Sequence, residues 1–203
     1  MSQHPETGLI MATYIEAKPF VEKIRWENSA EKPFPVYYLK NLALVVSGIG
    51  KVNAAAACAW LSAAASPKYI VNIGAAGANL DGLPPGRIYL IREALDADRI
   101  NFKTGRPLCY SPDIMEGFET TRLATSDTPV LDPEQRRKAA AFAELSDMEG
   151  AAVIQTAQKF QARCFALKFI SDTPQHTTGR QIAANIREHR ESVFREVRGI
   201  IGV

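Results

Sequence analysis

The chain has 203 residues, a length that suits one folding domain with a sizeable core. Apolar residues make up 46% of the sequence and charged residues 23%, which is ordinary for a globular protein. The 24 Lys and Arg against 22 Asp and Glu give a formal net charge of +2. This balance gives no electrostatic reason to expect nucleic acid or an anionic membrane as a partner.

The three cysteines, Cys58, Cys109 and Cys164, are far apart and form neither a disulfide framework nor a CxxC metal pair. The scattered histidines lack the spacing of zinc ligands. The N-terminal segment lacks the basic start and apolar stretch of a signal peptide, and no apolar run is long enough to span a bilayer. We therefore expect a cytoplasmic protein with no metal or organic cofactor.

The N-terminal half predicts strands and helices in alternation. Short apolar runs indicate buried strands, and apolar residues at helical spacing indicate helices. The expected elements are a strand at 8–13, a helix at 16–25, strands at 36–39 and 42–47, a helix at 51–65 and a strand at 69–73. The Gly- and Ala-rich segment 74–78 is expected to be the loop after that last strand.

The C-terminal half continues the alternation. It predicts a strand at 87–92, a long loop at 101–119, a strand at 121–125, a helix opened by Asp132-Pro133-Glu134, a helix at 149–160, a strand at 164–170 and a helix at 179–201. This order favours an α/β fold with three α/β/α layers around a mixed, mainly parallel sheet. We expect residues 1–203 to form one such domain.

Ligands of open α/β sheets bind beyond the carboxyl ends of the strands, and three acidic residues are expected there. Glu16 could activate water as a general base, or could be an ordinary acidic residue in the first turn of a helix. Asp172 could hold a proton at the end of a buried strand and act as a general acid, or could cap a turn. Glu149 could accept hydrogen bonds from vicinal hydroxyls, or could be another early-helix acid.

The order of five segments along the chain resembles the purine nucleoside phosphorylase/uridine phosphorylase superfamily. The segments are GLIMATYIEAKPF, SGIGKVNAA, YIVNIGAAGANLDGLPPGRIYLIREALDAD, SDMEGAAV and ALKFISD. The most similar branch is that of methylthioadenosine/S-adenosylhomocysteine nucleosidase. The similarity runs from about Gly8 to Asp172 with a gap at 101–119, where the chain is shorter than the family pattern.

The resemblance implies a role for each matching residue. Asp172 matches the acid that protonates purine N7, and Glu16 matches the glutamate that positions or deprotonates water. Glu149 matches the glutamate that binds the ribose hydroxyls, with Met148 packed on the sugar. Further substrate contacts are expected from Ser171, Ala75, Gly77, Lys168 and, in a neighbouring subunit's site, Phe102. The resemblance also implies a homodimer.

The nucleophile is expected to be water. The phosphorylases of the superfamily carry an arginine two positions before the GS of the glycine loop, where this chain has Asn72, and Ala75 replaces the serine. Lys168 stands where nucleosidases have an arginine. We therefore expect a nucleosidase that acts on a purine nucleoside of the adenosine type with a modified 5′ position. The alternatives are a phosphorolytic enzyme and a non-catalytic nucleoside-binding protein on the same fold.

Overall fold

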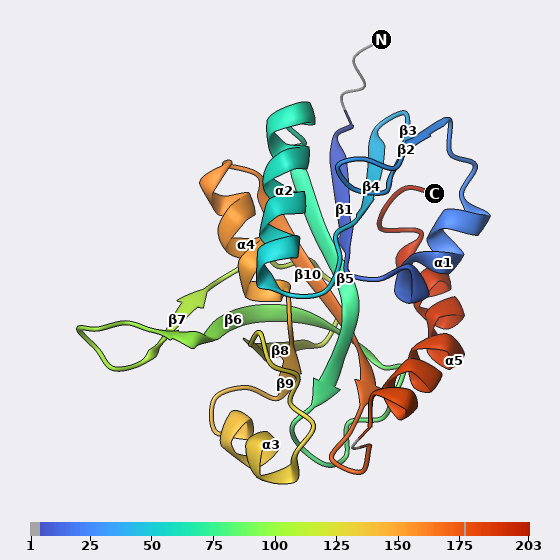
Figure 1. Ribbon diagram of the computed structural model, residues 1–203. Helices are drawn as coiled ribbons and strands as arrows, with labels where there is room; N and C mark the ends of the chain where they lie inside the picture. Colours follow the sequence, from blue (N-terminus) through green and yellow to red (C-terminus); the bar gives the residue numbers. More distant parts are fainter. Residues whose placement is uncertain (1–4, 177) are drawn as a thin grey trace.

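The computed structural model describes residues 5–176 and 178–203, and its centre is a mixed β-sheet between two helical layers (Figure 1). The strands are β1 (Thr7–Met11), β2 (Asn28–Ala30), β3 (Val36–Leu39), β4 (Leu42–Val46), β5 (Tyr69–Ala78), β6 (Ile88–Ile100), β7 (Pro107–Tyr110), β8 (Thr120–Thr125), β9 (Leu145–Asp147) and β10 (Arg163–Asp172). The helices are α1 (Tyr14–Lys23), α2 (Lys51–Ala65), α3 (Pro133–Ala140), α4 (Gly150–Lys159) and α5 (Gly179–Val197).

The sheet has the strand order β10-β6-β8-β9-β5-β1-β4-β3-β2, with β7 paired to β6. An additional pairing of β10 with β5 closes part of the sheet into a ring. The central ladders, β4–β1, β1–β5 and β5–β10, are parallel, whereas β6 runs antiparallel to β10. The predicted α/β class with a mixed sheet is therefore confirmed. The closed ring of strands was not predicted from the sequence.

Two apolar clusters flank the sheet because successive side chains of a strand point to opposite faces. In β1, Leu9 packs on the side of α1 and α5, and Ile10 packs on the side of α2 and α4. Phe20 of α1 and Phe194 of α5 meet edge to face with ring centroids 5.0 Å apart. These two helices and the pair α2 and α4 cover opposite faces in Figure 1.

Two expected loops contain strands. Segment 74–78, predicted as a loop, extends β5, because its small residues pair with β10 in the register Lys168–Gly74 to Asp172–Gly77. A Cβ at Gly74 would lie 3.1 Å from Glu16 Oε1 and 3.4 Å from Lys168 Nζ. The small residues therefore make room for buried side chains of the site, and do not mark a turn.

The second expected loop, 101–119, contains β7, and β6 runs on to Ile100 before turning into it. The short strands β2 and β9 were not predicted, because three residues are too few to show a pattern. The helix predicted at Asp132-Pro133-Glu134 is confirmed, since the Asp132 carboxylate caps α3 by accepting from the N–H groups of Glu134 and Gln135. Within the described residues, no helix is both long and apolar enough to cross a membrane.

Candidate active site

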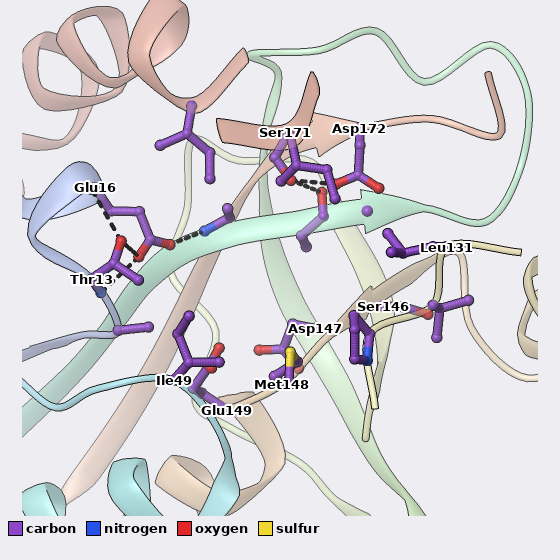
Figure 2. Close-up of a pocket in the computed structure, with 18 residues that line it drawn as sticks. Thr13, Glu16, Ile49, Leu131, Ser146, Asp147, Met148, Glu149, Ser171 and Asp172 are labelled. Carbon is purple, nitrogen blue, oxygen red and sulfur yellow. Dashed lines mark hydrogen bonds between the residues drawn. The ribbon is translucent and has the colours of Figure 1, made fainter. Parts of the chain in front are cut away.

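A cavity of about 160 Å³ lies at the carboxyl ends of β1, β5 and β10. These three strands are parallel neighbours, so the residues that follow them meet at one edge of the sheet. Figure 2 shows Glu16 and Thr13 on one side of the cavity, Ser171 and Asp172 on another, and the segment 147–149 facing them. The side chains come from distant parts of the chain, so only the folded protein brings them together.

Glu16 is held rigidly at the start of α1. Thr13 caps the helix, and Glu16 Oε2 accepts hydrogen bonds from the Thr13 backbone N–H at 2.8 Å and its hydroxyl at 2.5 Å. Glu16 Oε1 accepts from the Ala75 N–H at 2.8 Å. Glu16 thus belongs to the capping box of α1 and also lines the cavity. Three donors fix the direction of its carboxylate.

Asp172 ends β10 and is 4% exposed. The Ser171 hydroxyl donates to Oδ1 at 2.5 Å, and the Arg136 guanidinium donates from Nη2 to Oδ2 in a buried ion pair. Asn185 of α5 donates to the Ser171 carbonyl at 2.8 Å, which ties this end of the strand to the helix beside it. The carboxyl group therefore lies in the cavity wall with a partner on each oxygen.

Glu149 precedes α4 and faces the cavity from the side of α2. Its Oε1 accepts the Gly50 N–H at 2.8 Å, and Gly50 has a φ of +99°, which favours glycine at this turn. Burial, and after it the negative charge of Asp147, raise the pKa of Glu149 to about 7. Lys168 and the Gly50 N–H act in the opposite direction. Glu149 therefore titrates near neutral pH.

Lys168 and Asp147 form a buried ion pair, with Nζ and Oδ2 2.8 Å apart. Asp147 lines the cavity, and Lys168 lies behind it. Asp147 also accepts the Thr125 hydroxyl at 2.6 Å and the Gly150 N–H at 2.7 Å. Burial lowers the pKa of Lys168, but the negative charges of Asp147, Glu149 and Glu16 outweigh it and raise that pKa above its usual value. Lys168 therefore remains the cation among three carboxylates.

The structure brings most of the residues singled out in the sequence to this one cavity. Its lining contains Glu16, Glu149 and Asp172 together with Met148, Ser171, Ala75 and Gly77. Lys168 is buried and does not line the cavity, so it lies behind the cavity wall. Phe102 is fully exposed beyond the end of β6 and lies outside the cavity of its own chain.

Some lining and supporting residues were not foreseen. Apolar side chains close the cavity from two loops and from α5, namely Ile49, Pro129, Val130, Leu131, Ile182 and Ile186. Asp147 and Arg136 support the site through buried ion pairs. In the sequence, Arg136 lies in a short basic cluster, which indicates a solvated surface and gives no sign of burial. Within the described residues, no group of three or more His, Cys, Asp or Glu is arranged to hold a metal ion.

The family model described as "Phosphorylase superfamily" matches residues 6–201. The chain belongs to this superfamily. It is 27% identical over 158 residues to the 5′-methylthioadenosine/S-adenosylhomocysteine nucleosidase of Shewanella loihica, covering 66% of this chain and 69% of the relative. The fold and the family expected from the sequence are therefore confirmed, and the relative's name agrees with the expectation of a nucleosidase.

Two solved structures from Helicobacter pylori share the fold. One is a 5′-methylthioadenosine/S-adenosylhomocysteine nucleosidase with butyl-thio-DADMe-Immucillin-A, with a TM-score of 0.85, 17% identity and 98% of both chains covered. The other is a futalosine hydrolase, also with a TM-score of 0.85 and 17% identity, covering 98% of this chain and 97% of that one. At this identity the likeness shows the fold alone.

Proposed function

We propose that this superfamily member hydrolyses the N-glycosidic bond of a purine nucleoside, of the adenosine type with a modified 5′ position. The observation that carries the proposal is the convergence of Glu16, Glu149 and Asp172 on one cavity. Cleavage of a nucleoside needs an acid at the leaving base, an acceptor for the ribose hydroxyls and a base for water. The three carboxyl groups supply these three functions from three sides of the cavity.

Asp172 is proposed to protonate the leaving base. Its proton passes to N7 of the purine while the bond between C1′ and N9 breaks, and the electron pair of that bond leaves with the base. The sugar then develops the positive charge of an oxocarbenium-like state. The apolar side chains of Pro129, Val130 and Leu131 line the same cavity and would exclude water from a purine ring.

Glu149 and Glu16 are proposed to act on the sugar side. The Glu149 carboxylate would accept hydrogen bonds from the ribose hydroxyls and offset the charge that develops on the ring. Glu16, oriented by Thr13 and Ala75, would take a proton from the water that attacks C1′. The products are the free base and the free sugar, and no cofactor takes part in the step.

Water is favoured over phosphate as nucleophile by the charges around the cavity. The lining carries the carboxyl groups of Glu16, Asp147 and Glu149, which repel an anion when ionised. The two cations in contact with the acidic residues of the cavity, Lys168 and Arg136, are paired with Asp147 and Asp172. Asn72, at the position where phosphorylases have an arginine, donates its side-chain N–H to the Ile10 carbonyl at 3.1 Å. These contacts leave little to hold a phosphate ion.

A second copy of the chain is proposed to complete the site. Phe102 is exposed in the turn between β6 and β7, and Ile49, which lines the cavity, is 55% exposed. Apolar side chains placed in this way would be covered by a homodimer, in which Phe102 of one subunit closes the cavity of the other.

The test is to incubate the enzyme with methylthioadenosine, S-adenosylhomocysteine and futalosine, each with and without phosphate. Free base and free sugar without phosphate are expected for at least one adenosine-type substrate. Formation of a sugar 1-phosphate only when phosphate is present would make the protein a phosphorylase. Binding without turnover of any of the three would remove the catalytic proposal.

A further inference from the structure

Arg136, in the middle of α3, is the largest fully buried side chain among the described residues. Its position is unexpected, since α3 is otherwise a polar helix with Arg137 and Lys138 beside it. Burying a guanidinium costs much free energy unless its charge is paired and its N–H groups find acceptors. The partners of its N–H groups therefore indicate which interaction offsets the cost of burying the charge.

Its contacts all lie at the end of β5 and β10. Nη2 donates to Asp172 Oδ2, and Nη1 donates to the Ala78 carbonyl at 2.7 Å. Nε has no hydrogen-bond partner among the described residues. The pairing with the carboxyl group of Asp172 is the strongest interaction that the position provides.

Gly77 shows that the backbone accommodates this pairing. A Cβ at Gly77 would lie 2.6 Å from Asp172 Oδ2 and 2.8 Å from Arg136 Nη1, closer than real Cβ atoms approach. Its small size therefore lets the acid and the guanidinium meet over β5. The ion pair thus depends on three elements: α3 carries Arg136, β10 carries Asp172, and β5 has a glycine where the two side chains meet.

The chain also links this ion pair to the cavity wall. Leu131, Val130 and Pro129 line the cavity, and the next residue, Asp132, caps α3. The helix that carries Arg136 thus begins directly after the apolar segment proposed to cover the base.

Other charged groups near Asp172 have partners of their own. Glu16 from α1 is held by Thr13 and Ala75, Glu149 by Gly50, and Asp147 by Lys168. On the loop after β10, His176 Nδ1 lies 3.2 Å from the Thr173 backbone nitrogen and 2.9 Å from the Thr173 hydroxyl. Arg136 is the cation that contacts Asp172 directly, so its charge acts on this carboxyl group more than any other does.

We propose that Arg136 is a positioning residue for Asp172: it holds the carboxyl group at the cavity wall and stabilises the carboxylate that forms when the proton passes to the leaving base. This inference rests on the proposed function, in which Asp172 is the acid. A guanidinium in contact with a carboxyl group favours its ionised form. Arg136 therefore promotes the transfer of the proton from Asp172 to the base.

The test compares Arg136→Gln and Arg136→Lys with the wild type in steady-state assays of base release. Arg136→Gln removes the charge, so we expect kcat to fall about tenfold or more with little change in KM. Arg136→Lys keeps the charge and should recover most of the lost kcat.

The matched control is Arg122→Gln, which breaks the ion pair of Arg122 with Glu144 at 2.8 Å, outside the cavity lining. It should leave both kcat and KM unchanged. A wild-type kcat in Arg136→Gln, or a loss of kcat that Arg136→Lys does not recover, would overturn the positioning role. If Arg136→Gln does not fold, Arg136→Lys decides alone, since a roughly tenfold loss of kcat despite the retained charge contradicts the proposal. A wild type that releases no base would contradict the proposed function instead.

Discussion

Lys168 Nζ lies 2.8 Å from Asp147 Oδ2, and the two side chains are 1% and 0% exposed. The pair joins β10 to the end of β9, with Asp147 in the cavity wall and Lys168 behind it. Burial lowers the pKa of Lys168, but the negative charge of Asp147, followed by those of Glu149 and Glu16, raises this pKa above its usual value. The charges of Lys168 and Asp147 thus act on the neighbouring acidic residues of the cavity, Glu149 in particular.

Lys168→Met should destabilise the protein strongly, because it leaves the Asp147 carboxylate buried without its cation. Loss of one partner of a buried ion pair costs roughly 3–5 kcal/mol of unfolding free energy. Urea denaturation followed by circular dichroism measures the change. Lys138→Met is the control, since the exposed pair of Lys138 with Glu134 on α3 should contribute about 0.5 kcal/mol or less. A loss of the same size in both variants would contradict the argument.

A double variant sharpens this test. Lys168→Met combined with Asp147→Asn removes the uncompensated charge and should recover a measurable part of the lost stability. Purely additive losses in the double variant would mean that Lys168 stabilises the core by packing and not by charge.

The raised pKa of Glu149 should make the free energy of unfolding depend on pH. Its pKa is raised from 4.5 to about 7 by burial first and by Asp147 second. Below pH 4.5 the group is protonated in both the folded and the unfolded chain. Between pH 4.5 and about 7 the unfolded chain ionises first, so the free energy of unfolding should fall as the pH rises through this window.

Replacing Glu149 with Gln should remove that fall. The comparison is made by urea denaturation of Glu149→Gln and the wild type at several pH values between 4.5 and 7.5, with Glu134→Gln on the exposed face of α3 as control. Glu134→Gln should keep the wild-type slope. Equal slopes in the wild type and Glu149→Gln would contradict the raised pKa of Glu149.

Asp172→Asn should abolish base release while the chain still folds and binds a nucleoside. An amide keeps one acceptor oxygen, for Ser171 or for Arg136, but cannot protonate the base, so we expect turnover to fall by a factor of about 100 or more. Release of free purine is followed chromatographically, and binding by calorimetry. The matched control is Asp113→Asn on the half-exposed pair with Arg163, outside the cavity. Undiminished turnover in Asp172→Asn would remove Asp172 as the acid.

The sequence was informative where a local pattern matches a local structure. Glu16 lies just after an apolar strand, and Glu149 stands at the start of a helix, so their positions at the sheet edge follow from strand and helix periodicity. Asp172 ends a buried run in the same way. Since parallel strands carry their carboxyl ends to one edge, the meeting of these residues could be predicted before any coordinates.

Other features depend on partners that are distant in the sequence. Segment 74–78 is rich in Gly and Ala because Glu16, Lys168 and Asp172 pack against it, and a local pattern cannot distinguish this from a loop. The burial of Arg136 follows from its pairing with Asp172, 36 residues away. Such long-range contacts override local composition, so the ion pairs that support the site could be found only in the folded structure.

Phe102 predicts a contribution from a second subunit. The side chain is fully exposed, so Phe102→Ala should leave the stability of a single subunit unchanged. If a homodimer places Phe102 against the partner's cavity, the variant should raise KM several-fold with a smaller effect on kcat, and weaken the dimer in analytical ultracentrifugation. Phe142→Ala is the control, because Phe142 is 50% exposed and does not line the cavity. A monomeric wild type with full activity, or a Phe102→Ala variant with unchanged KM and association, would contradict a shared site.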